Sequence, residues 1–168
     1  MRAATLVPVE EYLSTSYDPD CDYVDGQIVE RNLGEKPHSR IQRKLLVYLD
    51  NRSKEFGIEA LPEQRVQVSR TRFRVPDVTV LLLPQDDDPI ITSPPHLCIE
   101  ILSRKDTMED MQERIEDYLR FGVKNIWIIS PRLQKAYVAT ATGTTEATSG
   151  KLETKDPVIG IPLSAVFE

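Results

Sequence analysis

Apolar residues recur at helical spacing in two long stretches of the chain. In Pro37–Phe56 and in Asp106–Phe121 they fall on one side of a helix, and a glycine follows each stretch as a stop signal. Asp106 or Thr107 is the candidate cap of the second helix. The pattern therefore predicts two amphipathic helices. A shorter one is expected over Pro8–Leu13, where proline stands in the first turn.

Apolar runs and alternating patterns predict strands elsewhere. Within Asp22–Glu30, the pair Asp25-Gly26 suits the two-residue turn of a hairpin. The tail from Thr142 to Glu168 is rich in turn residues, so short edge strands without chemistry are expected there. Further strands are expected at Glu63–Ser69, Arg72–Leu83, Leu97–Leu102, Asn125–Ile129 and Gln134–Thr140. This order of helices and strands predicts an α/β or α+β fold.

Length and composition predict one compact domain over residues 1–168. A chain of 168 residues with 40% hydrophobic content can bury a substantial core. No apolar stretch approaches the roughly 20 residues that span a bilayer, and charge appears too early for a secretory signal. We therefore expect a soluble, cytoplasmic protein. The chain has only two cysteines, Cys21 and Cys98, and no disulfide is expected between them. Its two histidines are far apart in the sequence, so no zinc site is expected either.

Charge is distributed unevenly along the chain. The formal net charge is -6, yet residues 31–74 carry 11 Lys and Arg against five Asp and Glu. Such a window is either a solvated face or a surface that faces phosphate groups, and the pattern leaves both interpretations open.

Two strand-like apolar runs each contain one carboxylate, Asp77 in Val75–Val80 and Glu100 in Leu97–Leu102. A buried carboxylate must be protonated, paired or bound to a cation. Pro76 lacks an N–H, which favours an edge or bulge at Asp77. If the strands are neighbours the two carboxylates converge, and their hard oxygen atoms suit magnesium or manganese. The alternative is a turn contact for Asp77 and an arginine partner, such as Arg74, for Glu100.

Several short motifs occur together in a specific order. They are Tyr23–Gly26, His38, Arg74–Val78, Glu100–Ser103, Asp106, Tyr118, Gly122-Val123 and Trp127. Taken together they resemble the Uma-two family, which is grouped with the restriction endonucleases as a bacterial branch of the PD-(D/E)XK nuclease superfamily. The resemblance implies a mixed central sheet flanked by helices, with an N-terminal hairpin.

The resemblance also implies a metal-dependent endonuclease that hydrolyses DNA. Asp77 and Glu100 would hold Mg²⁺, or Mn²⁺ in its place. The superfamily's usual lysine is replaced by Leu102, and Arg114 on the following helix stands where relatives carry the lysine. Arginine can stabilise phosphate charge but does not readily act as a base. Lys105 is a competing cation, and an exposed ion pair with Asp110 is the alternative for Arg114.

The remaining site expectations rest on the N-terminal half. Glu30 and His38 are possible additional site residues, although an exposed hairpin glutamate and a histidine at a helix start are equally ordinary. Lys36, Arg40 and Arg74 are expected to contact nucleic acid. A homodimer would suit the cutting of paired strands, by analogy only. Tyr118 and Trp127 are expected in the core.

Two other functions stay open at this point. A catalytically degenerate nucleic-acid-binding module would explain Leu102 and Arg114 in place of lysine. A non-enzymatic protein-interaction domain would explain the acidic balance outside residues 31–74.

Overall fold

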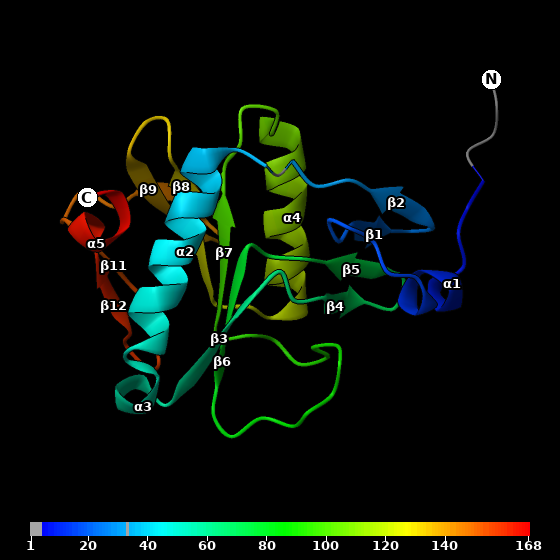
Figure 1. Cartoon of the computed structure of the whole chain (residues 1–168), viewed down its shortest axis with the longest axis horizontal. Coiled ribbons are helices and arrows are strands. Elements are labelled where there is room, and N and C mark those ends of the chain that lie inside the picture. Colours follow the sequence, from blue (N-terminus) through cyan, green and yellow to red (C-terminus); the bar gives the residue numbers. More distant parts are fainter. Residues whose placement is uncertain (1–4, 33) are drawn as a thin grey trace.

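A computed structural model describes residues 5–32 and 34–168, which form a mixed α+β fold around a six-stranded sheet (Figure 1). In sheet order its strands are β10 (Gly143–Glu146), β9 (Lys135–Thr140), β8 (Asn125–Ser130), β7 (Leu97–Ile101), β6 (Val78–Leu82) and β3 (Ile58–Pro62). β7 and β8 run parallel, whereas the other neighbours are antiparallel. The sheet is therefore mixed, as expected.

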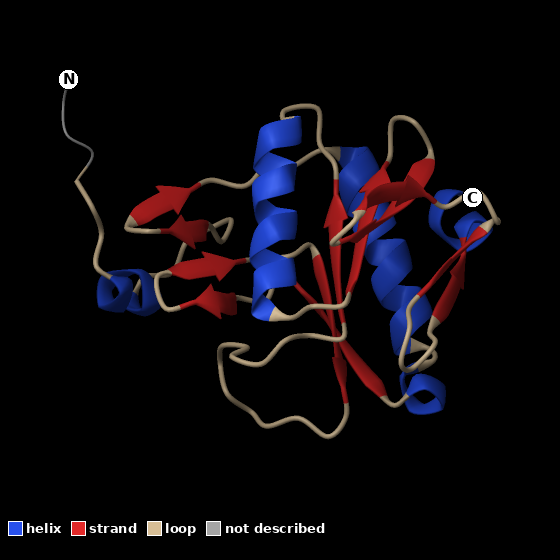
Figure 2. Ribbon diagram, turned by 180° about the vertical axis from the view of Figure 1, so that it is seen from behind, coloured by secondary structure: helices blue, strands red, loops and turns tan. Residues whose placement is uncertain are grey.

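Two long helices cover opposite faces of this sheet, α2 (Lys36–Asp50) and α4 (Met108–Phe121) (Figures 1 and 2). The strand β7 shows how its residues divide between them. Leu97, Ile99 and Ile101 pack in the core on the α2 side, whereas Cys98 packs with the buried residues of α4. This two-residue period turns Glu100 toward α4, as the alternation predicts.

The capping signals at α4 act as predicted. The Thr107 side chain accepts a hydrogen bond from the backbone N–H of Asp110, whose carboxylate reaches back to the N–H of Thr107. Gly122 ends the helix at φ 107°, a conformation that costs glycine little. The other long helix is shorter than predicted. It ends at Asp50, and a separate turn, α3 (Ser53–Phe56), precedes Gly57.

The predicted strand Arg72–Leu83 is in fact two strands in different sheets. β5 (Arg72–Arg74) joins a four-stranded sheet with β4 (Val66–Ser69) and the hairpin of β1 (Asp22–Val24) and β2 (Gln27–Val29). The link Val75–Asp77 then carries the chain into β6. Pro76 cannot donate to a ladder, so the strand is interrupted there. β3, which the patterns did not predict, pairs with β6.

The tail differs from the expectation of edge strands alone. Only β10 extends the main sheet, while β11 (Lys151–Glu153) and β12 (Gly160–Pro162) pair with each other and α5 (Leu163–Phe167) follows. Leu152, Ile161 and Val166 belong to the same core cluster as α2. The tail therefore completes the hydrophobic core.

At the far side of the four-stranded sheet, the predicted short helix α1 (Val9–Ser14) is present. It packs through Tyr12 against Tyr23 and Phe73. Both cysteines are free and buried. No helix in residues 5–32 and 34–168 is long and apolar enough to cross a membrane.

Candidate active site

Asp77 and Glu100 meet where β6 begins and β7 ends. The antiparallel register pairs Val78 with Ile99, and the same register continued by one step would set Asp77, the residue before β6, opposite Glu100. Both are buried, with 4% and 3% of their surfaces exposed. Opposed residues on neighbouring strands have Cβ atoms roughly 5 Å apart. The strands are thus neighbours and the two carboxylates converge.

Three donors hold the Asp77 carboxylate. Arg31 Nη2 donates to Oδ1 at 2.7 Å, His38 Nε2 lies 3.2 Å from the same atom, and the Ile101 N–H donates to Oδ2 at 2.7 Å. Burial raises the pKa of Asp77, but the hydrogen bond from His38 and the positive charges around it lower that pKa overall. The pKa of His38 is raised because the same carboxylate outweighs burial. Asp77 is therefore held ionised.

Glu100 has the opposite electrostatic character. The pKa of Glu100 is raised to about 7, because burial and the nearby Asp77 carboxylate outweigh Arg114 and the Tyr118 hydroxyl, which lower it. Tyr118 donates a hydrogen bond to Oε1, and Arg114 Nη1 lies 3.5 Å from Oε2. The site therefore pairs an ionised carboxylate with one that ionises near neutral pH.

Arg114 is buried beside these carboxylates, so the exposed pair with Asp110 is not its environment. Its Nε lies 3.7 Å from Asp22 Oδ2, and its Nη1 lies 3.8 Å from Asp106 Oδ1. Asp106 is itself held, because it accepts hydrogen bonds from Asn32 Nδ2 at 3.1 Å and from the Ser103 N–H at 2.7 Å. Arg114 thus contacts carboxylates from three separate segments.

Arg74 belongs to a buried ion-pair network, and its expected contact with nucleic acid is corrected here. Only 2% of its surface is exposed, and its guanidinium lies 3.0 Å from Asp22 and 2.7 Å from Asp117. It is not the partner of Glu100 either, since Arg114 takes that place. Arg74 turns inward because it lies opposite Val66 in the register of β4 and β5, under α4.

The other predicted site residues lie at the surface. Glu30, Lys36, Arg40 and Lys105 are exposed, and His38 alone among the N-terminal candidates reaches a carboxylate of the site. Within the described part of the chain, Lys105 has no ion pair with Glu100, which leaves Arg114 as the cation beside that carboxylate. The expected roles of Lys36 and Arg40 stay predictions.

Sequence reasoning missed Asp22, Arg31 and Asp117 as members of the site. Nothing in their local sequence indicates a site. Asp22 starts a hairpin, Arg31 lies in the basic window, and Asp117 lies on a helix. A signal existed in α4, where Arg114, Asp117 and Tyr118 follow the spacing of one helix face. The signal for Asp22 and Arg31 was weaker, because their partners are distant in sequence.

The carboxylate pair fits a hard divalent ion in its donor chemistry. Asp77 and Glu100 supply oxygen ligands from facing positions, and a cation between them would relieve the repulsion that helps raise the pKa of Glu100. Residues 5–32 and 34–168 hold no ready-made group of three or more His, Cys, Asp or Glu side chains around a metal position. A bound ion would therefore share Asp77 with Arg31 and His38.

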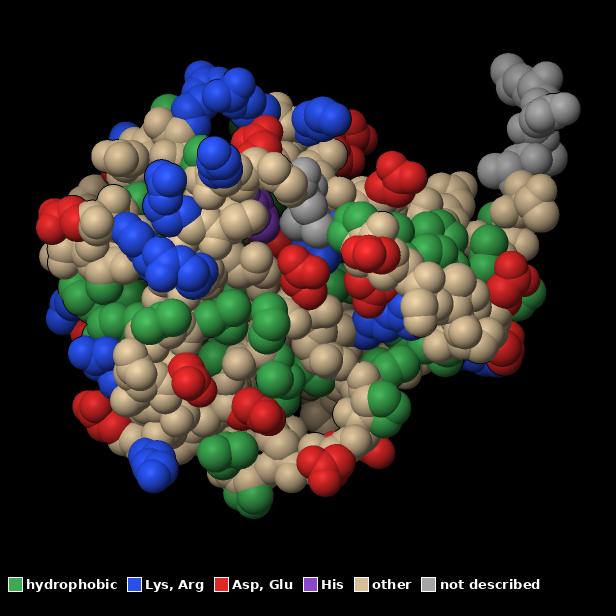
Figure 3. Space-filling view, in the orientation of Figure 1, with side chains coloured by type: hydrophobic (Ala, Val, Ile, Leu, Met, Phe, Trp, Pro, Cys, Tyr) green, Lys and Arg blue, Asp and Glu red, His purple; other side chains and the backbone are tan. Residues whose placement is uncertain are grey.

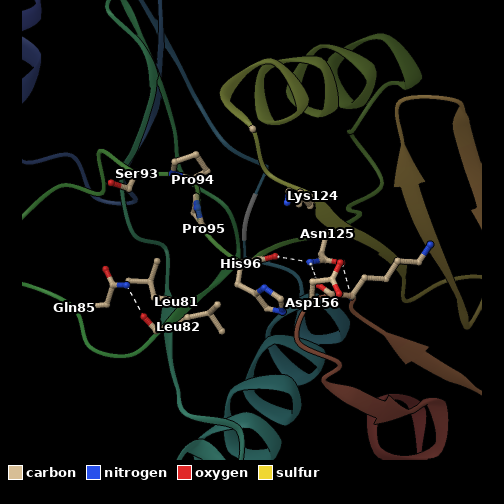
Figure 4. A pocket seen from close by; sticks show the side chains of 12 residues that line it. Leu81, Leu82, Gln85, Ser93, Pro94, Pro95, His96, Lys124, Asn125 and Asp156 are labelled. Carbon is tan, nitrogen blue, oxygen red and sulfur yellow. Dashed lines mark hydrogen bonds between the residues drawn. The ribbon is translucent and has the colours of Figure 1, made fainter.

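Two cavities lie at opposite ends of the parallel strands β7 and β8. One of about 340 Å³ adjoins the site and is lined by Ser103, Asp106 and Ser130 among others. The second, of about 330 Å³, lies where the strands begin, beside His96 and Asn125. Figure 4 shows Asn125 between His96 and Asp156 in that second cavity, far along the strands from the carboxylates.

The mixed sheet, with helices on both faces and two carboxylates where neighbouring strands meet, is the arrangement of the restriction-endonuclease-like nucleases. The chain belongs to the Uma2 family, whose model, described as "Putative restriction endonuclease", matches residues 9–163. The expected family and fold are thereby confirmed.

A solved structure shares this fold over almost its whole length. It is the crystal structure of "a putative nuclease belonging to DUF820" from Anabaena variabilis ATCC 29413, with a TM-score of 0.80 and 21% sequence identity. The match covers 96% of this chain and 97% of that one. No curated protein matches the chain.

Proposed function

We propose that this protein is a Mg²⁺-dependent endonuclease that hydrolyses phosphodiester bonds of DNA. The observation that supports this most is the meeting of Asp77 and Glu100, two buried carboxylates of opposite pKa behaviour, beside the buried guanidinium of Arg114. Family membership makes a nucleic acid the expected substrate. Asp77 and Glu100 would hold the ion, and Mn²⁺ would serve in its place.

Asp77 and Glu100 would hold the divalent ion, which would supply Lewis-acid chemistry for phosphodiester hydrolysis. The chain's own residues position the two carboxylates and stabilise charge on the phosphate. Arg31 and the Ile101 N–H fix the Asp77 carboxylate, and Tyr118 fixes that of Glu100. Arg114, placed next to Glu100, offers positive charge to the phosphate oxygens as negative charge grows on them.

Arg114 does not take the proton of the attacking water. A guanidinium keeps its proton in proteins. Burial lowers the pKa of Arg114, but the negative charges of Glu100, Asp22 and Asp106 outweigh it and raise that pKa overall. His38 also holds a proton at neutral pH more firmly than a free histidine, because it faces Asp77. Charge stabilisation is therefore the role that the residues of this site support best.

The test is cleavage of supercoiled plasmid DNA with Mg²⁺ or Mn²⁺. The native chain should nick or cut the plasmid, and Asp77→Asn and Glu100→Gln should each lose that activity. Glu59→Gln, an exposed carboxylate on β3, is the matched control and should cut as the native chain does. Equal cleavage by all four proteins, or by none, would overturn the proposal.

A second candidate is a degenerate module that binds nucleic acid without cutting it. The observation behind it is Leu102 where the superfamily carries lysine, with arginine at position 114. Arg114→Lys separates the two functions. If only that variant cuts DNA, the native chain is the degenerate module; if the native chain cuts and the variant cuts no faster, it is the nuclease.

A further inference from the structure

The cavity of about 340 Å³ next to the carboxylates lies where a ligand is favoured by topology. β7 and β8 are the parallel pair of the sheet, and the Leu102 N–H extends their pairing by donating to the Ile129 carbonyl at 2.8 Å. The residues after both strand ends, together with the start of α2, line this one cavity. In open sheets, ligands bind outside the carboxyl ends of parallel strands.

Two arginines line this cavity, one after each strand. Arg104 follows β7 and Arg132 follows β8, and both are exposed. Neither has a carboxylate within 4.0 Å in the part of the chain that the structure describes, in contrast to Arg72 and Arg74, which are paired several times over. Figure 3 shows Lys and Arg side chains gathered over α2, whose start lines the cavity, and above it.

The acidic residues of the cavity do not cancel this charge. Asp106 is engaged by Asn32, by the Ser103 N–H and by Arg114. Glu35 is the other carboxylate of the lining. With Asp106 paired to Arg114, the charged groups of the lining that have no ion pair within the described residues are Arg104, Arg132 and Glu35, and this surplus of one positive charge favours an anionic ligand.

The cavity also adjoins the proposed catalytic groups. Arg114 Nη1 lies 3.8 Å from Asp106, a lining residue, and 3.5 Å from Glu100. An anion held here would thus lie one side chain away from the proposed position of the scissile phosphate. The hydroxyls of Ser103 and Ser130, both in the lining, add neutral hydrogen-bonding groups.

We propose that Arg104 and Arg132 bind backbone phosphates that neighbour the scissile one on the same nucleic-acid strand. This subsite rests on the proposed nuclease function. Arginine suits it because its planar fork grips phosphate oxygens in a bidentate manner.

The test measures binding of a 20-bp DNA duplex by fluorescence anisotropy, at several salt concentrations and without divalent ions, so that no strand is cut. Each cation that contacts a phosphate adds about 0.9 to the slope of log K against log salt. The double variant Arg104→Gln/Arg132→Gln should bind more weakly at low salt and lose about 2 from that slope. Glu35→Gln should tighten binding by roughly two- to fivefold.

The matched control is Lys124→Gln/Lys155→Gln, which removes the same charge from the cavity at the opposite end of β7 and β8. Its slope should equal that of the native chain. Equal losses in both double variants, or none in either, would overturn the subsite while the native chain still binds and cuts DNA. Native protein that neither binds the duplex nor cuts plasmid would overturn the proposed function and the subsite with it.

Discussion

The two ends of the strand pair β7 and β8 use polar groups in opposite ways. Where the strands end, buried ion pairs join Asp77 to Arg31 and Glu100 to Arg114. Where they begin, Asn125 and His96 make neutral hydrogen bonds to the tail. Burying charge is costly even when it is paired, whereas neutral hydrogen bonds stabilise loops at little cost. The difference supports the proposal that the charged end carries the function.

The largest effect is expected from Arg74→Leu. The variant leaves Asp22 and Asp117, both buried, without their shared cation, and the loss of one partner from a buried pair costs about 3 to 5 kcal/mol. Urea unfolding measures this, with Arg70→Leu in the nearby exposed turn as the control. A variant as stable as the native chain would show that Arg72 and Arg114 suffice as the cations of Asp117 and Asp22.

Glu100→Gln should separate function from stability at the same end. The neutral amide keeps the shape of the side chain and can still accept the hydrogen bond from Tyr118, so unfolding should change by less than about 1 kcal/mol. Cleavage should fall about 100-fold or more, because a ligand of the proposed metal is lost. The cleavage rate and the free energy of unfolding in urea are measured on the same preparation of the variant. Unfolding at much lower urea would make Glu100 a structural residue instead.

At the opposite end, Asn125→Ala should cost stability alone. Asn125 Nδ2 donates to the carbonyls of His96 and Lys155, and Oδ1 accepts from the Lys155 N–H at 2.9 Å. Leaving these backbone groups unpaired costs about 1 to 3 kcal/mol. The unfolding midpoint should drop while the cleavage rate of the folded protein stays native. A loss of cleavage without a loss of stability would contradict the division between the two ends.

The smallest effect is a pH dependence at the same end. Burial lowers the pKa of His96, and its Nε2 lies 3.0 Å from the Thr154 hydroxyl, which itself donates to the Pro157 carbonyl. Unfolded histidine titrates near 6.5, so the unfolded chain binds this proton first as pH falls. Stability from His96 is therefore complete above about pH 6.5 and declines below it. His96→Gln should lose less stability than the native chain between pH 7 and pH 5 in urea unfolding.

The sequence alone predicts much of the fold because its local signals agree with the final packing. The stripes of α2 and α4, the capping of α4 and the alternation of β7 appear in the structure close to where they were expected. Pro76 predicted an edge or bulge at Asp77, but it did not predict that the chain passes there from one sheet to another. The sequence patterns did not predict β3 and α5, because both are short and depend on pairing or packing with distant segments.

The site was predictable only in part, for a similar reason. A carboxylate inside an apolar run is conspicuous, which is how Asp77 and Glu100 were found. The partners of those carboxylates are 46 residues away for Arg31 and 18 for Tyr118, and no local pattern joins them. For Arg74 the prediction was wrong. The basic window around it indicated a binding surface, but the fold places Asp22 and Asp117 against the Arg74 guanidinium.

The link Val75–Asp77 makes the proposed site sensitive to chain length as well as to the identity of Asp77. Its three residues carry the chain from the last pair of β5 to the first of β6, with Asp77 one step before Val78. Three residues span at most about 10 Å even when fully extended, so a link shortened by one residue would have to give up a pair of β5 or of β6. Loss of the first pair of β6 would release Asp77 from its place beside Glu100. We therefore expect insertions and deletions within Val75–Asp77 to abolish the proposed cleavage of DNA, although loops elsewhere in the chain would tolerate them.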